Sequence, residues 1–257
     1  MFRKLWYAIL IVACITVSQP YAAGLEVAIG GWQQSLGGSL GYEALSATDI
    51  LDLENDLGFD DENRMIGRIN IDTPIFFPNI YLAGAPAEFE GTGSKSIAFN
   101  FGDTTYNADT VLTSKITINQ YDVGLYYGLP FIKTASAGKF NIDVGLNLRI
   151  LDLEASLSGL SGAVTVQEKE SITLPVPMLY LAFQIMPTDS FSIEAEGRGV
   201  AIGDNKLYSL IGRLRYQFAG PVFIAGGYRL DQLDVDEEDV EADVDLGGAF
   251  VELGLKF

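Results

Sequence analysis

Histidine is absent from the 257 residues of this chain. Its absence removes the usual general base of Ser-His-Asp hydrolases and the commonest protein ligand of zinc. The carboxylates of Glu194 and Glu196 are close enough in sequence for acid–base work, but beside Arg198 we interpret them as members of ion pairs. We therefore expect a protein that is not an enzyme and that holds no cofactor.

Cysteine occurs once, as Cys14, inside an N-terminal segment with the features of a secretory signal. Arg3 and Lys4 precede an uncharged run at 5–17, whose 13 residues are fewer than the about 20 that a membrane-spanning helix needs. Small residues follow, so we predict a signal peptide over 1–23 and a mature chain over 24–257. Lipidation at Cys14 stays open as an alternative. After removal of Cys14 the chain would have no thiol for disulfides or metal sites.

Basic residues are scarce, with 16 Lys and Arg against 34 Asp and Glu and a net charge of −18. Such an acidic chain is a poor ligand for nucleic acid or for the anionic headgroups of a cytoplasmic leaflet. No apolar run long enough for a membrane helix follows residue 17, yet the mean hydropathy is +0.22. A transmembrane β-barrel reconciles these facts, because it distributes its apolar band over alternating residues.

Alternating apolar and polar residues mark ten segments of the chain. We predict an all-β fold, a transmembrane antiparallel up-and-down β-barrel with ten strands; eight or twelve strands are the alternatives because the first and third segments are indistinct. Short turns at 74–79, 130–138, 187–190 and 219–221 alternate with longer polar loops, as in barrels with short periplasmic turns. One of these loops is expected at 156–169, and in the polar segment 91–114 the residues Ile97, Phe99 and Phe101 indicate a hairpin that projects past the membrane. The expected strands are 25–35, 65–71, 80–86, 121–129, 140–149, 178–185, 191–198, 208–218, 224–231 and 249–257.

Charged side chains are expected on the inner face of these strands. Seven acidic and seven basic residues share that parity, so the lumen is predicted to be nearly neutral and the excess negative charge to lie in loops. One interpretation is a salt-bridged interior that fills the lumen; the other is a charged constriction that lines a narrow pore. The candidates for this charge network are Arg68, Asp122, Asp143, Arg149, Glu194, Glu196, Arg198, Arg213, Arg215, Arg229, Asp231 and Glu252, joined by Glu26 and Lys256.

Two acidic segments stand apart, at 49–62 and 231–245. Closely spaced carboxylates can collect Ca²⁺ or Mg²⁺, but neither segment matches a defined calcium-loop pattern. We interpret both as solvated loops. The alternative is that divalent cations bind at these loops, for which the candidate ligands are Asp236, Glu237, Glu238 and Asp239.

The closing strand, 249–257, resembles the last strand of bacterial outer-membrane barrels, in which a terminal aromatic serves as an assembly signal; here that residue is Phe257. Several further segments resemble a Gram-negative outer-membrane β-barrel family that is largely uncharacterised. The resemblance implies an outer-membrane barrel and transfers no catalytic or binding residue. The segments that carry it are 31–34 (GWQQ), 52–62 (DLENDLGFDDE), 176–181 (VPMLYL), 194–197 (EAEG), 203–208 (GDNKLY) and 226–229 (GGYR).

Two functions are compatible with these features. The first is a narrow pore or a passage for small hydrophobic solutes. The second is a non-conducting structural or interaction barrel that displays acidic external loops. Either would lie in the outer membrane after signal-peptide cleavage, in contact with lipid, lipopolysaccharide and the barrel-assembly machinery, and would not bind nucleic acid. Whether the segments 36–62 and 91–114 enter the lumen decides between the two.

Overall fold

The computed structural model describes residues 24–257 except residues 75, 219, 238 and 239. The predicted signal peptide lies outside the described residues, and so do two of the candidate cation ligands, Glu238 and Asp239. No helix of the described part of the chain is long and apolar enough to cross a membrane.

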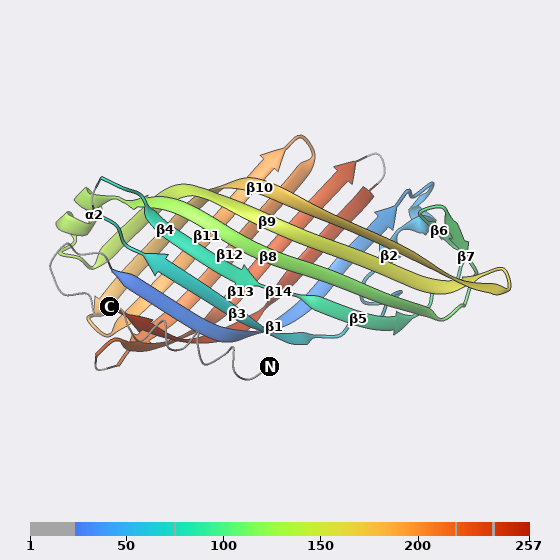
Figure 1. The fold of residues 1–257 in the computed structure, drawn as a ribbon. Coiled ribbons are helices and arrows are strands. Elements are labelled where there is room, and N and C mark those ends of the chain that lie inside the picture. Colours follow the sequence, from blue (N-terminus) through green and yellow to red (C-terminus); the bar gives the residue numbers. More distant parts are fainter. Residues whose placement is uncertain (1–23, 75, 219, 238–239) are drawn as a thin grey trace, which may run out of the picture.

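Ten strand positions of the described residues close an antiparallel barrel, in which each strand pairs with its neighbours along the chain (Figure 1). The ring closes where the first strand pairs with the last, from Glu26 opposite Lys256 to Tyr42 opposite Val240. The predicted fold and strand number are confirmed. The strands are β1 (Leu25–Tyr42), β3 (Glu62–Ile71), β4 (Asn79–Ala85) continued by β5 (Glu88–Gly93), β8 (Leu112–Gly128), β9 (Phe140–Ser161), β10 (Val164–Thr188), β11 (Phe191–Ile202), β12 (Asn205–Gln217), β13 (Val222–Glu237) and β14 (Val240–Lys256).

The third position of the barrel is shared by two short strands, because both β4 and β5 pair with β8. The break between them falls at Pro86, which has no backbone N–H to donate to a ladder. The indistinct third strand of the sequence is therefore one interrupted strand.

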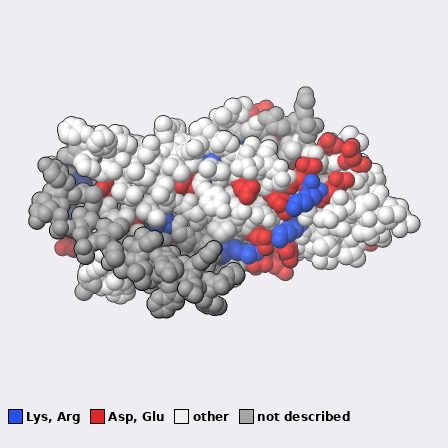
Figure 2. Space-filling view, viewed as in Figure 1, with Lys and Arg blue, Asp and Glu red and all other residues white. Residues whose placement is uncertain are grey.

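The outer wall of the barrel is apolar over a broad band. Side chains that alternate with the lumen-facing residues are exposed there, as in barrels whose wall contacts lipid. Figure 2 shows this uncharged band, bordered at one side by an oblique stripe of charged side chains. Salt bridges among Glu62, Arg64, Glu88, Glu90 and Lys115 belong to the charged surface. Exposed members of the band include Ile29, Val123, Leu125, Leu146, Leu148, Leu181, Ile193, Leu214, Val251 and Leu253.

Two segments predicted to be loops are strands instead. The prediction of a loop at 156–169 is wrong, because β9 and β10 continue to a tight turn at Gly162, whose φ of +62° suits glycine. The prediction of an acidic loop at 231–245 is also wrong, because β13 and β14 cover it up to residues 237 and 240. Apolar residues such as Leu233 and Val244 alternate with the acids there, so one face of the hairpin still packs inward.

The two ends of the barrel differ in height. One end carries the short turns, the short helix α2 (Pro130–Ala135) and the C-terminus (Figure 1). Exposed aromatic side chains gather beside these turns, including Phe76, Phe77, Phe131, Phe140 and Phe257. At the other end the hairpin of β9 and β10 projects past the barrel; we call its residues 151–174 the arm.

The mouth near the arm is filled by a plug, which we define as residues 43–61 and 94–111. It contains the 3-10 helix η1 (Ala47–Asp49), the strand β2 (Leu51–Asp52) and a hairpin of β6 (Phe99–Phe101) and β7 (Thr104–Tyr106). The predicted hairpin around Phe99 and Phe101 therefore exists, but it packs inward: both aromatic side chains are buried.

Candidate functional site

Six charged side chains from five strands form a closed ring of ion pairs inside the barrel. Arginines and glutamates alternate around this ring, so every charge has an opposite charge on both sides. The N···O distances, starting from the Glu26–Arg68 pair, are 2.5, 3.1, 3.3, 3.2, 3.7 and 2.8 Å. In that order the members are Glu26 of β1, Arg68 of β3, Glu252 of β14, Arg213 of β12, Glu194 of β11 and Arg215 of β12.

Small residues on β13 make this ring possible. Arg213 reaches Glu252 across the intervening strand, whose lumen-facing positions beside the pair are Ala225 and Gly227. A Cβ atom at Gly227 would lie 1.9 Å from the carbonyl oxygen of Gly212, so this close approach requires glycine. The ring therefore depends on residues that carry no charge.

A further ion pair extends the ring toward β10. Glu196 accepts from Arg213 at 2.5 Å and from Arg198 at 2.9 Å. The guanidinium of Arg198 in turn lies over the rings of Tyr81 and Tyr180, at 4.5 and 5.2 Å from their centroids. Contacts with a carboxylate and with aromatic faces compensate in part for the water that a buried arginine has lost.

A second charged cluster joins β8, β9 and β13. Arg149 donates from Nε and Nη2 to the two carboxylate oxygens of Asp122, at 2.8 and 2.9 Å, which is the bidentate geometry that arginine favours. Its Nη1 lies 3.6 Å from Asp231, which also pairs with Arg229 at 2.7 Å. Arg229 donates to Gln120 at 2.6 Å and covers the ring of Trp32 at 4.6 Å.

The structure therefore brings eleven of the twelve predicted network residues into ion pairs. Asp143 is the exception among the described residues: it is half-buried near the turn end, where it accepts from Asn141 at 2.8 Å. Lys256 reaches Glu26 from the rim at 3.5 Å and is more exposed than the arginines.

An apolar layer covers the charged networks on the side of the arm. Lumen-facing residues of the wall, such as Trp32, Ile211 and Phe250, form one cluster with residues of the plug. Phe89 of β5 stands edge-on to Phe59, with 6.4 Å between ring centroids, and Phe99 stacks on Tyr106 at 5.2 Å. The plug side chains in the cluster include Leu51, Leu53, Leu57, Phe59, Phe99, Phe101 and Tyr106.

Polar contacts hold the two parts of the plug together. Asp49 accepts from the backbone N–H of Asn100 at 2.7 Å and from Ser46 at 3.0 Å. These donors, the backbone N–H of Asn100 first among them, hold the pKa of Asp49 below its ordinary value. Lys95 donates to the carbonyl of Ile50 at 2.6 Å and to Asp56 at 2.8 Å. Residues far apart in the sequence are thus fixed against each other.

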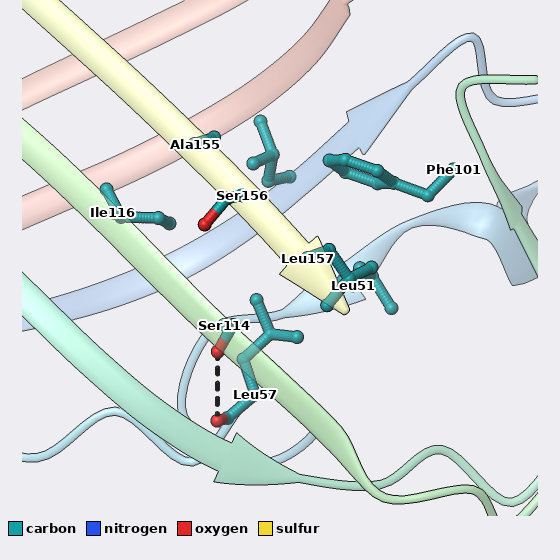
Figure 3. Close-up of a pocket in the computed structure, with 9 residues that line it drawn as sticks. Leu51, Leu57, Phe101, Ser114, Ile116, Ala155, Ser156 and Leu157 are labelled. Atoms are coloured by element: carbon teal, nitrogen blue, oxygen red, sulfur yellow. Dashed lines mark hydrogen bonds between the residues drawn. The ribbon is translucent and has the colours of Figure 1, made fainter. Parts of the chain in front are cut away.

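Two small cavities lie inside the barrel. The first has a volume of about 10 Å³, and its lining includes Leu51, Leu57, Phe101 and Leu157, which are drawn in Figure 3. Beside them Ser114 donates to the carbonyl of Leu57 at 3.4 Å, the dashed line in that figure. A second cavity, of about 20 Å³, lies beside Gln120 and Asp231. Each is about the size of one water molecule.

Burial decides what the lumen arginines can do in this conformation. A residue that lines an aqueous pore must touch water, but the exposed fractions of Arg149, Arg198 and Arg213 are 0%, 3% and 3%. These guanidinium groups contact carboxylates within the networks instead. The arrangement therefore matches a salt-bridged interior more closely than a charged constriction.

Of the four candidate cation ligands, only Asp236 has a side chain that the structure describes. Asp236 lies on the exposed end of β13, opposite Glu241. No group of three or more carboxylates in the described part of the chain is arranged to hold a metal ion.

Several residues that build the site carry no charge and were not predicted as site residues. Tyr81, Tyr180 and Trp32 contact the arginines through their rings, and Asn147 donates to Asp122 at 2.7 Å. Each of these residues lies at a lumen-facing position of its strand, so the alternation in the sequence could have identified it. The plug residues had no such signal, since their positions depend on contacts between distant segments.

No protein-family profile matches this chain. No curated protein matches it either. Among solved structures it is similar to the outer membrane protease OmpT from Escherichia coli, with 12% identity over 93% of this chain and 99% of that chain and a TM-score of 0.55. It is also similar to the translocator domain of the autotransporter NalP from Neisseria meningitidis, at 10% identity over 100% and 95% with a TM-score of 0.47. Ail, the attachment invasion locus protein of Yersinia pestis, follows at 10% identity over 91% and 99% with a TM-score of 0.32. At these identities the likeness to OmpT shows a shared β-barrel fold and nothing of activity.

Proposed function

We propose that this protein is a sealed outer-membrane barrel of a Gram-negative bacterium. It does not conduct, and its arm serves as an external interaction surface. The observation that carries the proposal is the filled lumen: two ion-pair networks lie under an apolar layer to which the plug contributes. Of the two functions considered from the sequence, this is the non-conducting one. The proposal contains no catalytic step, in keeping with the absence of histidine.

The apolar outer band and the asymmetry of the ends support the membrane location and the orientation. The short-turn end, with its exposed aromatic residues, matches the periplasmic side of such barrels, and the arm then projects outward. Lipid and lipopolysaccharide would contact the band, and the signal peptide and the barrel-assembly machinery would bring the chain to the membrane. Phe257 would act as the assembly signal.

Planar-bilayer recording of the folded protein tests the proposal. We expect no steady conductance steps from the wild-type barrel, whereas a general-diffusion porin reconstituted in the same way should conduct. A plug variant, in which residues 44–60 are replaced by a short Gly-Ser linker, removes four large side chains from the apolar layer. We expect this variant to conduct more than the wild type.

Steady wild-type steps whose number grows with the amount of folded protein would contradict the proposal. So would uptake of small solutes by proteoliposomes at the rate that the porin gives. Folding of each sample is checked by its heat-dependent mobility on a gel, so that a silent bilayer cannot come from unfolded chain.

A further inference from the structure

The arm leaves one edge of β10 unpaired. β10 pairs with β9 from Val164 opposite Ser161 onward, but with β11 only from Leu179 opposite Gly199. β11 ends at Ile202, so no described strand lies on the other side of residues 164–174 (Figure 1). Eleven extended residues span about 35 Å, long enough for a full strand of a partner. We call residues 164–174 the free edge.

Two prolines show which backbone groups point outward along this edge. Pro175 and Pro177 pair with Ile150 and Leu148 of β9, and neither has an N–H to donate to that ladder. Proline is tolerated in a strand where its nitrogen faces away from the ladder. In an antiparallel pair the outward and inward positions alternate. The residues that present N–H and C=O groups at the free edge are therefore those of the same parity: Thr165, Gln167, Lys169, Ser171 and Thr173.

The distribution of these prolines also matters. Proline protects an exposed edge against pairing with other chains. Here both prolines stand at the base of the arm, beside the barrel, and none lies within the free edge. The part of β10 that extends beyond β11 thus has five unblocked backbone positions in sequence.

The side chains of the free edge indicate which strand would fit. On the face that continues the lumen side, the order is Val164, Val166, Glu168, Glu170, Ile172 and Leu174. The exposed fractions of Val164 and Ile172 are 64% and 53%, although this part of the chain lies outside the apolar band. A complementary strand has apolar side chains at its ends and lysine or arginine in its centre, because opposite charges across a strand pair stabilise it.

A second copy of this chain fits the edge poorly. If the free edges of two copies pair antiparallel, the residues whose backbone groups face outward must lie opposite each other. The register is then symmetric about a single residue, which is the centre of the pair. Centring on Lys169 sets Lys169 opposite itself and Glu168 opposite Glu170, and centring on either glutamate sets that glutamate opposite itself. Like charges directly opposite destabilise a pair. Centring on Gln167 or Ser171 sets both glutamates opposite apolar side chains instead.

We infer that the free edge of β10 is a strand-addition site for an extended segment of another protein, with basic side chains flanked by apolar ones on one face. Backbone hydrogen bonds to the five outward residues would supply affinity. The exposed carboxylate of Glu170 would select the basic segment, together with Glu168, whose Oε1 also accepts from Thr104 of the plug at 2.5 Å. The net charge of −18 on this chain favours a basic partner in the same sense. This inference rests on the proposed function, because it names the class of partner that would bind the arm.

A pair of synthetic peptides tests this inference on the folded full-length barrel in lipid nanodiscs. Both have twelve residues, with threonine at every second position and valine or isoleucine at the outer positions of the other face. The two central residues of that face are lysines in one peptide and glutamates in the other. Fluorescence anisotropy of the labelled peptides should show saturable binding of the lysine peptide, with the glutamate peptide weaker by about tenfold or more.

Two variants locate the binding. Ser171→Pro removes an outward N–H at a position equivalent to those of Pro175 and Pro177. The hydrogen bonds between β10 and β9 should therefore remain, whereas binding of the lysine peptide should be lost. Glu170→Lys should weaken the lysine peptide and strengthen the glutamate peptide, each by about tenfold. Lysine-peptide binding that survives Ser171→Pro, equal affinity of both peptides, or no binding by a folded wild-type barrel would overturn the inference.

Two other outcomes separate this inference from its alternatives. Dimerisation of the wild type in nanodisc-free detergent that is lost in Ser171→Pro would assign the edge to a second copy and overturn the choice of partner. A barrel that conducts and yet binds the lysine peptide would overturn the sealed-barrel proposal while it supports the strand-addition site. A barrel that does not conduct and binds neither peptide would support the sealed-barrel proposal and overturn the strand-addition site.

Discussion

Arg149 and Asp122 form the buried ion pair whose removal is easiest to interpret. Methionine at position 149 keeps much of the volume of the arginine and removes its charge. It leaves the Asp122 carboxylate buried, with Asn147 as the remaining hydrogen-bond donor that the described structure assigns to it. Breaking a buried pair by removing one partner costs about 3–5 kcal/mol. Because Arg198 and Arg229 also act on Asp122 electrostatically, we expect the free energy of unfolding to fall by about 3 kcal/mol.

Asp122→Asn should cost less, about 2 kcal/mol, because Arg149 keeps Asp231 at 3.6 Å. The double variant has no unpaired charge at this place and should also lose only about 2 kcal/mol, so the two losses should not add. A coupling energy of about 3 kcal/mol is therefore expected from the cycle. Urea unfolding in lipid vesicles measures it, followed by the fluorescence of Trp32, which is buried and is the only tryptophan after residue 23.

The matched control is an exposed ion pair on the arm, Lys169 with Glu154 at 2.8 Å. Its cycle, with Lys169→Met and Glu154→Gln, should give a coupling below about 1 kcal/mol because water screens both charges. If the losses at Arg149 and Asp122 add, or if the double variant is the least stable of the four, then this pair is not a buried, mutually dependent one. A lumen filled by mutually dependent ion pairs would then be ruled out.

Three further predictions concern the apolar layer, the plug and the C-terminus. Phe89→Ala should lower the free energy of unfolding by about 3–5 kcal/mol because its ring is fully buried, whereas Phe77→Ala, on an exposed ring, should cost far less in the same urea titration. The pKa of Asp49 is lowered, so its carboxylate stabilises the plug above the ordinary value of 3.8, and this stabilisation is lost as the pH falls below that value. Protease cleavage of the plug should therefore increase below pH 3.8 in the wild type and already occur at neutral pH in Asp49→Asn. Asp103→Asn is the control that should be unaffected. Phe257→Ala should reduce the yield of folded protein in cells and leave the urea midpoint unchanged, because the side chain is exposed while the backbone N–H still donates to Leu25 at 2.9 Å.

The strands of the membrane band were predictable because their two faces differ in chemistry. Alternation placed Arg68, Arg149 and Arg198 on the face opposite the exposed leucines, and the structure shows that face toward the lumen. The number of strands followed from the same alternation and from the positions of the short turns. Parity alone also separates residues that contact lipid from residues that contact each other.

The outer ends of the strands could not be predicted in the same way. Beyond the membrane band both faces of a hairpin can be polar, so the signal of alternation fades, and the acidic residues from 231 to 245 looked like a solvated loop. The plug was less accessible still. Its apolar residues, such as Leu53 and Phe101, are far apart in the sequence, and one of the hydrogen bonds that join its two parts connects Asp49 to a backbone group 51 residues away.

The closed wall and the free edge of β10 arise from one difference in strand length. β10 pairs with β9 over 22 residue pairs and with β11 over eight. The part of β10 that pairs with both neighbours therefore belongs to a closed wall, and the part that pairs with β9 alone belongs to an open sheet. The charges of the lumen are neutralised within the closed part, whereas Glu168 and Glu170 lie in the open part. Because the arginine networks and the outward positions of the free edge share no contact, changes at the two places should add in their effects on stability. Ser171→Pro should therefore leave the coupling energy between Arg149 and Asp122 unchanged, which the same urea titrations can measure; a changed coupling would mean that the arm and the lumen act as one unit.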